Sequence, residues 1–119
     1  LAEDNELNGE IEMEILKGMG LGVEWAEDGD ICLERMRQAG EGYYDLVLMD
    51  IQMPNRNGYQ ASEAIRNMDS LSKAGIPIVA MTANAFEEDK QNAYAAGMDA
   101  HLAKPIDIQK LRKVLADYL

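Results

Sequence analysis

The fold is decided by one stretch, Tyr43-Tyr44-Asp45-Leu46-Val47-Leu48-Met49-Asp50-Ile51-Gln52-Met53-Pro54. Its apolar run over 46–49 shows no alternation of apolar and polar residues, which is typical of a strand buried on both faces in a parallel sheet. Asp50 then stands at the carboxyl end of that strand, where open α/β sheets place their ligand crevices. A charge there needs a cation or hydrogen bonds to offset the loss of water. Because an isolated Asp more often only caps a loop, the neighbouring strands decide its role.

Outward from this stretch, strand-like and helix-like segments alternate. Further strands are expected over 23–26, 76–81 and 100–103. Four helices are expected from rows of apolar residues, namely Leu7, Ile11, Ile15 and Met19; Cys32, Leu33, Met36 and Ala39; Ala61, Ala64, Ile65 and Met68; and Ile108, Leu111, Val114, Leu115 and Tyr118. An Ala-rich helix is expected from Asn84 or Phe86 to Ala96, and Asn5 or Asp4 is expected to cap the first helix. The alternation predicts a single α/β domain over 1–119, with helices on both faces of a parallel sheet.

Composition restricts the function. Lys and Arg total 11 against 22 Asp and Glu, a formal net charge of −11, and so acidic a surface disfavours direct contact with nucleic acid or an anionic membrane. Cys32 has no second cysteine for a disulfide and is expected in the core, and one His with one Cys does not make a zinc site. Because no apolar run reaches membrane-spanning length and no signal peptide is visible, a cytoplasmic location is expected.

Polar residues stand at the ends of the expected strands: Glu3 and Asp4, Asp50, Thr82, and Lys104. The carboxyl ends of parallel strands meet at one edge of a sheet, so these side chains are expected to converge. Carboxylates suit Mg²⁺, and a carboxylate can attack phosphorus to form an aspartyl phosphate. Phosphoryl transfer also needs a cation and a hydroxyl for the phosphoryl oxygens, which Lys104 and Thr82 provide. The set predicts a phosphoryl-transfer site centred on Asp50.

Five short motifs, in order, resemble the receiver domains of two-component signalling, the modules found in response regulators and hybrid sensor histidine kinases. They are Ala-Glu-Asp-Asn at 2–5, Leu-Met-Asp-Ile-Gln-Met-Pro at 48–54, Asn-Gly at 57–58, Ala-Met-Thr-Ala at 80–83, and Ala-Gly-Met-Asp-Ala-His-Leu-Ala-Lys-Pro at 96–105. The match covers nearly the whole chain, and five such motifs in order are highly specific. The second and the last resemble receivers of hybrid sensor histidine kinases most.

The resemblance implies a flavodoxin-like (βα)5 three-layer sandwich whose parallel sheet has the strand order 2-1-3-4-5. Only Leu1 and Ala2 stand where the first, central strand belongs, so that strand is expected to be largely missing and the domain N-terminally truncated. The implied partner is a histidine kinase or a histidine phosphotransfer protein, docking on the helix after Asp4 around Leu7 and Ile11. The oligomeric state stays open, a homodimer included.

The resemblance also implies the roles of the site residues. Asp50 is the expected phosphoacceptor, taking the phosphoryl group from a phosphohistidine. Mg²⁺ is the expected cofactor, held by Glu3, Asp4, Asp50 and the backbone carbonyl of Gln52. Lys104 is expected to pair with the phosphoryl group. Such a module catalyses its own phosphorylation and dephosphorylation but is not a turnover enzyme.

The switch residues implied by the family are Thr82 and His101, and the bond between Lys104 and Pro105 is expected to be cis. His101 stands where the family usually has Tyr or Phe, and it can equally be a half-exposed residue of an edge strand. Glu3 stands where Asp is commoner, a change that the family tolerates.

Three other classes remain as alternatives. A phosphatase of the haloacid-dehalogenase type needs a second Asp two residues after the nucleophile, where this chain has Gln52. A flavodoxin-like cofactor binder needs a phosphate loop rich in Ser, Thr and Gly after the first strand, where the acids Glu3 and Asp4 would repel phosphate. A degenerate receiver used only for interaction is disfavoured because all the key residues are present.

Overall fold

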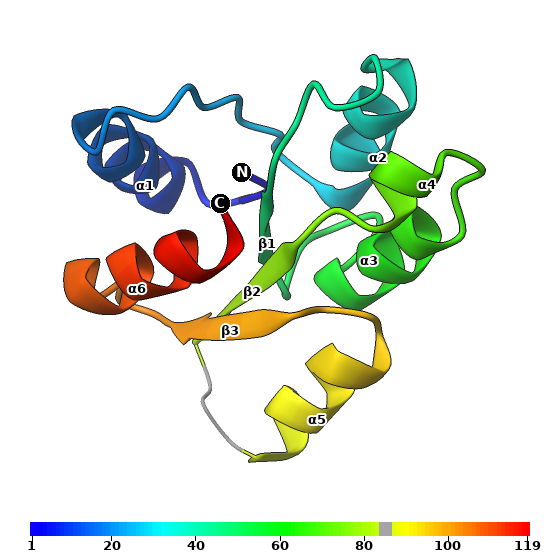
Figure 1. Ribbon diagram of the computed structural model, residues 1–119. Coiled ribbons are helices and arrows are strands. Elements are labelled where there is room, and N and C mark those ends of the chain that lie inside the picture. Colours follow the sequence, from blue (N-terminus) through cyan, green and yellow to red (C-terminus); the bar gives the residue numbers. More distant parts are fainter. Residues whose placement is uncertain (84–86) are drawn as a thin grey trace.

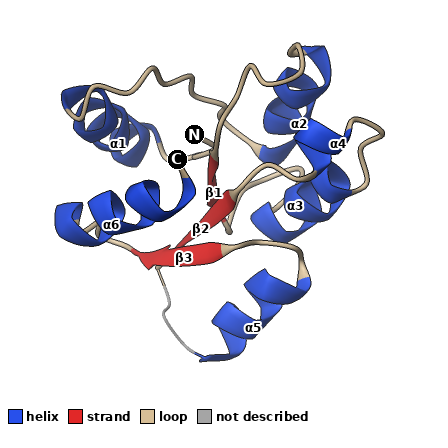
Figure 2. Cartoon of the chain, in the orientation of Figure 1, coloured by secondary structure: helices blue, strands red, loops and turns tan. Residues whose placement is uncertain are grey.

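The computed structural model describes residues 1–83 and 87–119. Its parallel sheet consists of β1 (Val47–Asp50), β2 (Ile78–Thr82) and β3 (Ala100–Ala103), in the order β1-β2-β3. The helices are α1 (Glu6–Gly18), α2 (Gly29–Gln38), α3 (Gly58–Arg66), α4 (Leu71–Ala74), α5 (Glu87–Ala95) and α6 (Ile108–Tyr118). The strands form the centre and the helices surround them, as Figure 2 shows. The predicted α/β class is confirmed, whereas the predicted start of the Ala-rich helix lies outside the described residues.

Beyond β1, the sheet continues through single-residue bridges. Ala2 is bridged in parallel to Met49 on one side and to Ala26 on the other. The Ala2 N–H donates to the carbonyl of Leu48 (2.8 Å), and the Asp50 N–H donates to the carbonyl of Ala2 (2.9 Å). The predicted strand over 23–26 is wrong: the segment contributes one bridge at Ala26. A strand needs a partner along its length, and among the described residues this segment pairs only through the bridge between Ala26 and Ala2.

β1 and β2 are buried on both faces, as their unbroken apolar runs predicted. Helices α1 and α6 lie on one side of the sheet, and α2 and α3 lie on the other (Figure 1). Alternate side chains of β1 and β2 enter two separate cores. The core on the α2–α3 side includes Val47, Met49, Ile78, Ala80, Leu33, Met36, Ala61 and Ile65, and Cys32 is buried there as predicted. The core on the α1–α6 side includes Leu48, Val79, Met81, Leu16, Leu102, Leu111 and Leu115.

Helix α1 faces the sheet with a different side from the one that its apolar row suggested. Its buried residues are Gly9, Glu12 and Leu16, whereas Leu7 is 66% exposed and Ile11 is 48% exposed. Residues four apart advance by 400°, so a row with that spacing drifts about 40° around the helix at each step. The start of the row therefore points to solvent, and only its later members approach the core.

The start of α3 is pressed against the end of β1. Asn57 caps the helix in a capping box with Gln60, and the Gly58 N–H donates to the Ile51 carbonyl (2.8 Å). A Cβ on Gly58 would lie 2.4 Å from the carbonyl oxygen of Asp50, so this close approach requires glycine. The contact fixes the backbone that carries the Asp50 side chain. Across the described part of the chain, no helix has the length and apolar character needed to cross a bilayer.

Candidate functional site

The predicted site residues meet at the carboxyl ends of the strands. Asp50 ends β1, Thr82 ends β2, and Lys104 directly follows β3. These three, with Asp4, border a cavity of about 220 Å³ whose lining also includes Asn5, Asn8, Ile51, Gln52 and Ala83. Glu3 has none of its surface exposed and contacts Lys104, which lines the cavity. The common edge expected from the sequence is therefore present.

Lys104 joins two of the acids. Its Nζ lies 2.6 Å from Oε1 of Glu3 and 3.2 Å from Oδ2 of Asp50. All three side chains are mostly buried, so water screens these ion pairs weakly. The ammonium thus holds the Asp50 carboxylate in a fixed position at the cavity wall.

The acids form a set suited to a hard cation. Glu3, Asp4 and Asp50 each offer a carboxylate oxygen, and these oxygens lie within 4.8 Å of one another. Oε2 of Glu3 is buried without a hydrogen-bond partner among the described residues. An all-oxygen set of this kind, with a cavity open to water, fits Mg²⁺.

The crowding of acids shifts their pKa values. Burial raises the pKa of Asp50 to about 8; the hydrogen bond and charge of Glu3 add to the shift, and Lys104 opposes it. Burial also opposes ionisation of Glu3, but hydrogen bonds with Asp50 and Lys104 outweigh it, so the pKa of Glu3 is lowered. Burial lowers the pKa of Lys104, but its acidic partners outweigh that effect and raise it. The metal-free cluster therefore retains protons near neutral pH.

Glu12 belongs to this cluster and was missed by sequence reasoning. It is only 6% exposed, on the sheet-facing side of α1, and its Oε2 has no hydrogen-bond partner in the described part of the chain. Burial, followed by the charge of Glu3, raises its pKa to about 8. Its spacing from Gly9 and Leu16, which puts the three on one helix face, was the signal that could have revealed it.

Other predicted residues lie around this centre. The Gln52 N–H donates to Oδ1 of Asp50 (3.3 Å), and Gln52 lines the cavity. His101 is half-buried in β3, and its ring meets that of Tyr94 edge-on with centroids 6.4 Å apart. The bond between Lys104 and Pro105 is cis.

Comparison with known proteins gives a family match. The family model described as "Response regulator receiver domain" matches residues 1–116. The hybrid signal transduction histidine kinase L of Dictyostelium discoideum is 33% identical over 99% of this chain and 7% of that kinase. The chain spans no more than 15% of the length of the first curated relatives that it matches.

Two solved structures that contain receiver domains each match 98% of this chain. The receiver domain of the sensor histidine kinase PA1611 of Pseudomonas aeruginosa PAO1, with a magnesium ion coordinated in its active site cleft, is 32% identical with a TM-score of 0.87, covering 98% of this chain and 92% of that one. A co-crystal structure of the Saccharomyces cerevisiae histidine phosphotransfer protein Ypd1 with the receiver domain of its downstream response regulator Ssk1 matches with 27% identity and a TM-score of 0.87, covering 98% of this chain and 84% of that one.

Proposed function

Because the chain belongs to the response regulator receiver domain family, we propose that it accepts a phosphoryl group on Asp50 from a phosphohistidine and acts as a switch in a phosphorelay. The observation that carries the proposal is the placement of Asp50, at the end of β1, within 3.2 Å of Lys104 and beside two further acids. A receiver is a signalling module, and its phosphorylated state is the signal.

In the proposed reaction, an ionised oxygen of Asp50 attacks phosphorus and forms a P–O bond. The P–N bond to the donor imidazole breaks, its electron pair stays on the ring nitrogen, and that nitrogen takes up a proton from water. Lys104 lies beside Asp50 and can neutralise a phosphoryl oxygen, and the Thr82 hydroxyl lies on the same cavity. Hydrolysis of the resulting acyl phosphate by water resets the switch.

We assign the metal site to Glu3, Asp4, Asp50 and the backbone carbonyl of Gln52. The carboxylate oxygens of the three acids already converge, and Gln52 is positioned by its N–H bond to Asp50. Bound Mg²⁺ would supply charge neutralisation for the phosphoryl oxygens. The proposed signalling face runs from Thr82, at the end of β2, to His101 on the neighbouring strand β3, and the ring contact of His101 with Tyr94 links β3 to α5.

The first test is phosphoryl uptake. After incubation with Mg²⁺ and acetyl phosphate, intact mass is expected to show the gain of one phosphoryl group, and none when EDTA replaces Mg²⁺. A folded protein that gains no mass would contradict the phosphoacceptor proposal and favour a receiver used only for interaction.

The exposed apolar start of α1 is the proposed docking face for a histidine phosphotransfer protein. Leu7 and Ile11 are exposed on α1, and Asn5 and Asn8, which lie on either side of Leu7 in the sequence, line the cavity. Leu7→Asp is expected to slow phosphoryl transfer from phosphorylated Ypd1 at least about tenfold, because an apolar anchor is lost from the contact. Uptake from acetyl phosphate should be unchanged. Leu71→Asp on α4 is the matched control, since Leu71 is 90% exposed and lies outside the proposed face.

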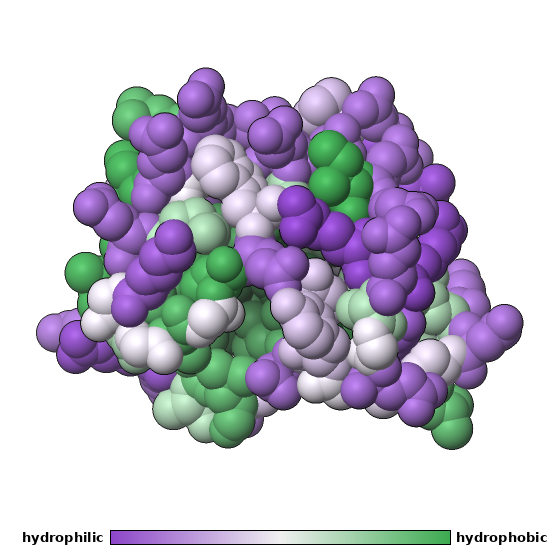
Figure 3. Space-filling model, turned by 90° about the horizontal axis from the view of Figure 1, so that it is seen from above, coloured by the Kyte–Doolittle hydropathy of each residue, from purple (hydrophilic) through white to green (hydrophobic). Residues whose placement is uncertain are grey.

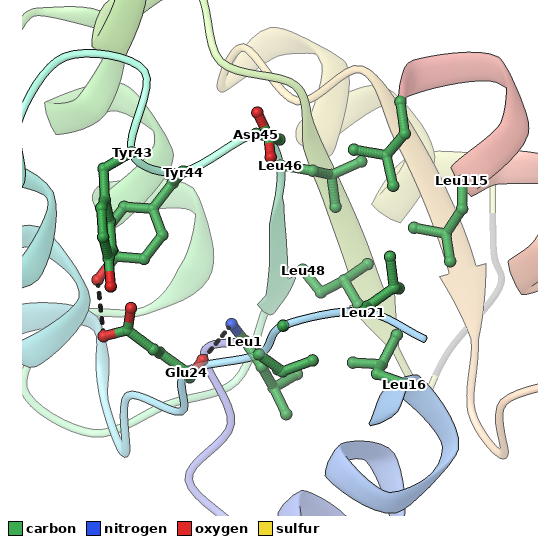
Figure 4. Close-up of a pocket in the computed structure, with 13 residues that line it drawn as sticks. Leu1, Leu16, Leu21, Glu24, Tyr43, Tyr44, Asp45, Leu46, Leu48 and Leu115 are labelled. Carbon is green, nitrogen blue, oxygen red and sulfur yellow. Dashed lines mark hydrogen bonds between the residues drawn. The ribbon is translucent and has the colours of Figure 1, made fainter. Parts of the chain in front are cut away.

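We also propose that an extended strand running into Leu1 completes a five-stranded sheet in the order 2-1-3-4-5. A groove of about 570 Å³ lies between β1 and the segment before Ala26, and in the view from above an apolar hollow opens among hydrophilic side chains (Figure 3). Its apolar lining includes Leu16, Leu21, Leu46, Leu48 and Leu115 (Figure 4). At its inner end, the backbone nitrogen of Leu1 donates to the Glu24 carbonyl (2.9 Å).

The backbone hydrogen bonds beside the groove support the proposed pairing of this strand with β1. The Leu48 carbonyl and the Asp50 N–H both bond to Ala2, so alternate residues of this strand direct their backbone groups toward the groove side. Extending the chain before Leu1 with five apolar, β-branched residues is expected to raise the free energy of unfolding by at least about 2 kcal/mol. An extension of equal length made of Gly and Ser is the control, and equal stability of the two would contradict the proposed strand.

A further inference from the structure

We propose that Trp25 is a positioning residue for the acidic pair Glu3–Asp4, acting through the backbone of Glu3 and through the start of α1. The inference rests on the proposed metal site, and it assigns a new role to a side chain that lies outside the cavity. Trp25 is the single tryptophan of the chain.

Two adjacent residues hold the Glu3 backbone from one side. The indole N–H of Trp25 donates to the Glu3 carbonyl (2.8 Å), and the Glu3 N–H donates to the carbonyl of Ala26 (3.0 Å). The Glu3 peptide groups are therefore fixed before and after its Cα. The side chain that leaves this Cα is the buried carboxylate bonded to Lys104.

The ring of Trp25 is also fitted against α1. A Cβ on Gly9 would lie 2.1 Å from Cζ2 of the indole and 2.5 Å from Cε2, so the ring occupies the space that any other residue at position 9 would need. The Gly9 N–H donates to the carbonyl of Asn5 (2.8 Å), in the first turn of the helix. The indole thus lies between the acidic pair and the helix that follows it.

This arrangement bears on cation binding. A cation needs the oxygens of Glu3, Asp4 and Asp50 to stay converged, and those of Glu3 and Asp4 are carried by the segment that Trp25 holds. Groups that orient metal ligands affect metal affinity strongly, typically by tenfold or more when removed. Without the indole N–H, the Glu3–Asp4 backbone loses one of its anchors and the three carboxylates converge less often.

The experiment distinguishes an effect on the position of the metal-binding carboxylates from an effect on the stability of the protein. Trp25 is replaced by 3-benzothienylalanine, which keeps the bicyclic shape and lacks the N–H, and in a second variant by Phe; Gly9→Ala displaces the ring. Mg²⁺ affinity is measured by titration calorimetry and thermal stability is measured in EDTA. Ile65→Val is the control, because it removes one methyl group from a fully buried side chain on α3, away from the acids.

All three site variants are expected to bind Mg²⁺ about tenfold more weakly than the parent protein, whereas Ile65→Val loses stability and keeps the parent affinity. Parent-like affinity in the folded benzothienylalanine variant would overturn the inference, as would equal weakening by Ile65→Val. A parent that binds no Mg²⁺ would overturn the proposed metal site, and this inference with it.

Discussion

Asp50→Asn is expected to abolish phosphoryl uptake from acetyl phosphate. The amide is a far weaker nucleophile than the carboxylate toward phosphorus, and no other described carboxylate both forms an ion pair with Lys104 and lines the cavity. The same change should stabilise the metal-free protein at pH 8, because it removes one acid from a buried cluster of like charges. Intact mass and urea unfolding in EDTA measure the two effects.

Asp45→Asn is the matched control for this variant. Asp45 precedes the same strand, is exposed, and lies on the groove at the opposite end from the cavity. It should keep full phosphoryl uptake and near-parent stability. Uptake by Asp50→Asn at the parent level would place the acceptor on another residue and contradict the proposed function.

The metal-free protein is expected to lose stability between pH 5.5 and pH 8. The pKa values of Asp50 and Glu12 are raised to about 8 in the folded state, mainly by burial, so the folded state retains protons that the unfolded state has already released. Where the folded state binds more protons, stability falls as pH rises, by about 1.4 kcal/mol per pH unit for each proton retained. One proton retained over this range corresponds to a loss of about 3 kcal/mol.

The ionisation of Glu3 and Lys104 affects the stability of the protein outside the range from pH 5.5 to pH 8. The pKa of Glu3 is lowered, so its contribution is lost only as pH falls through the acid range, and the pKa of Lys104 is raised, so the ammonium stays charged throughout. Urea unfolding in EDTA at the two pH values tests the prediction, and Asp50→Asn should reduce the slope. Saturating Mg²⁺ should restore stability at pH 8, because it binds the ionised acids. A slope that is flat or rises with pH would contradict a proton-holding cluster.

Sequence reasoning predicted the structure best where a single sequence pattern determined it. Continuous apolar runs predicted β1 and β2, and the polar residue at the end of each strand predicted the edge where Asp50, Thr82 and Lys104 lie. Parallel strands leave little freedom in where their carboxyl ends lie. Asn5 or Asp4 was also expected to cap α1, and the structure places the cap at Asn5, whose side chain accepts a hydrogen bond from the Asn8 N–H.

The sequence failed where tertiary contacts outweigh local preference. Glu12 was overlooked because a charged residue on a helix is ordinarily solvated, whereas here it packs toward Glu3 and carries a raised pKa. The short helix α4, capped by Ser70, has too few residues to produce a periodic pattern. The segment before Ala26 has strand-like residues, but strand formation depends on a neighbour that the sequence pattern does not reveal.

The excess of acidic side chains around Lys104 also bears on the order in which a cation and a phosphoryl donor bind. Among the described residues, four carboxylates, those of Glu3, Asp4, Glu12 and Asp50, gather near this one ammonium. Once Asp50 and Glu12, whose pKa values are raised to about 8, have released their protons, such a cavity repels a phosphoryl donor that carries negative charge until a cation has entered it. If the proposed phosphorelay function holds, the acids that would bind the cation also set the order of binding: the cation enters first, the phosphoryl donor enters second, and little phosphoryl transfer occurs when the cation is scarce.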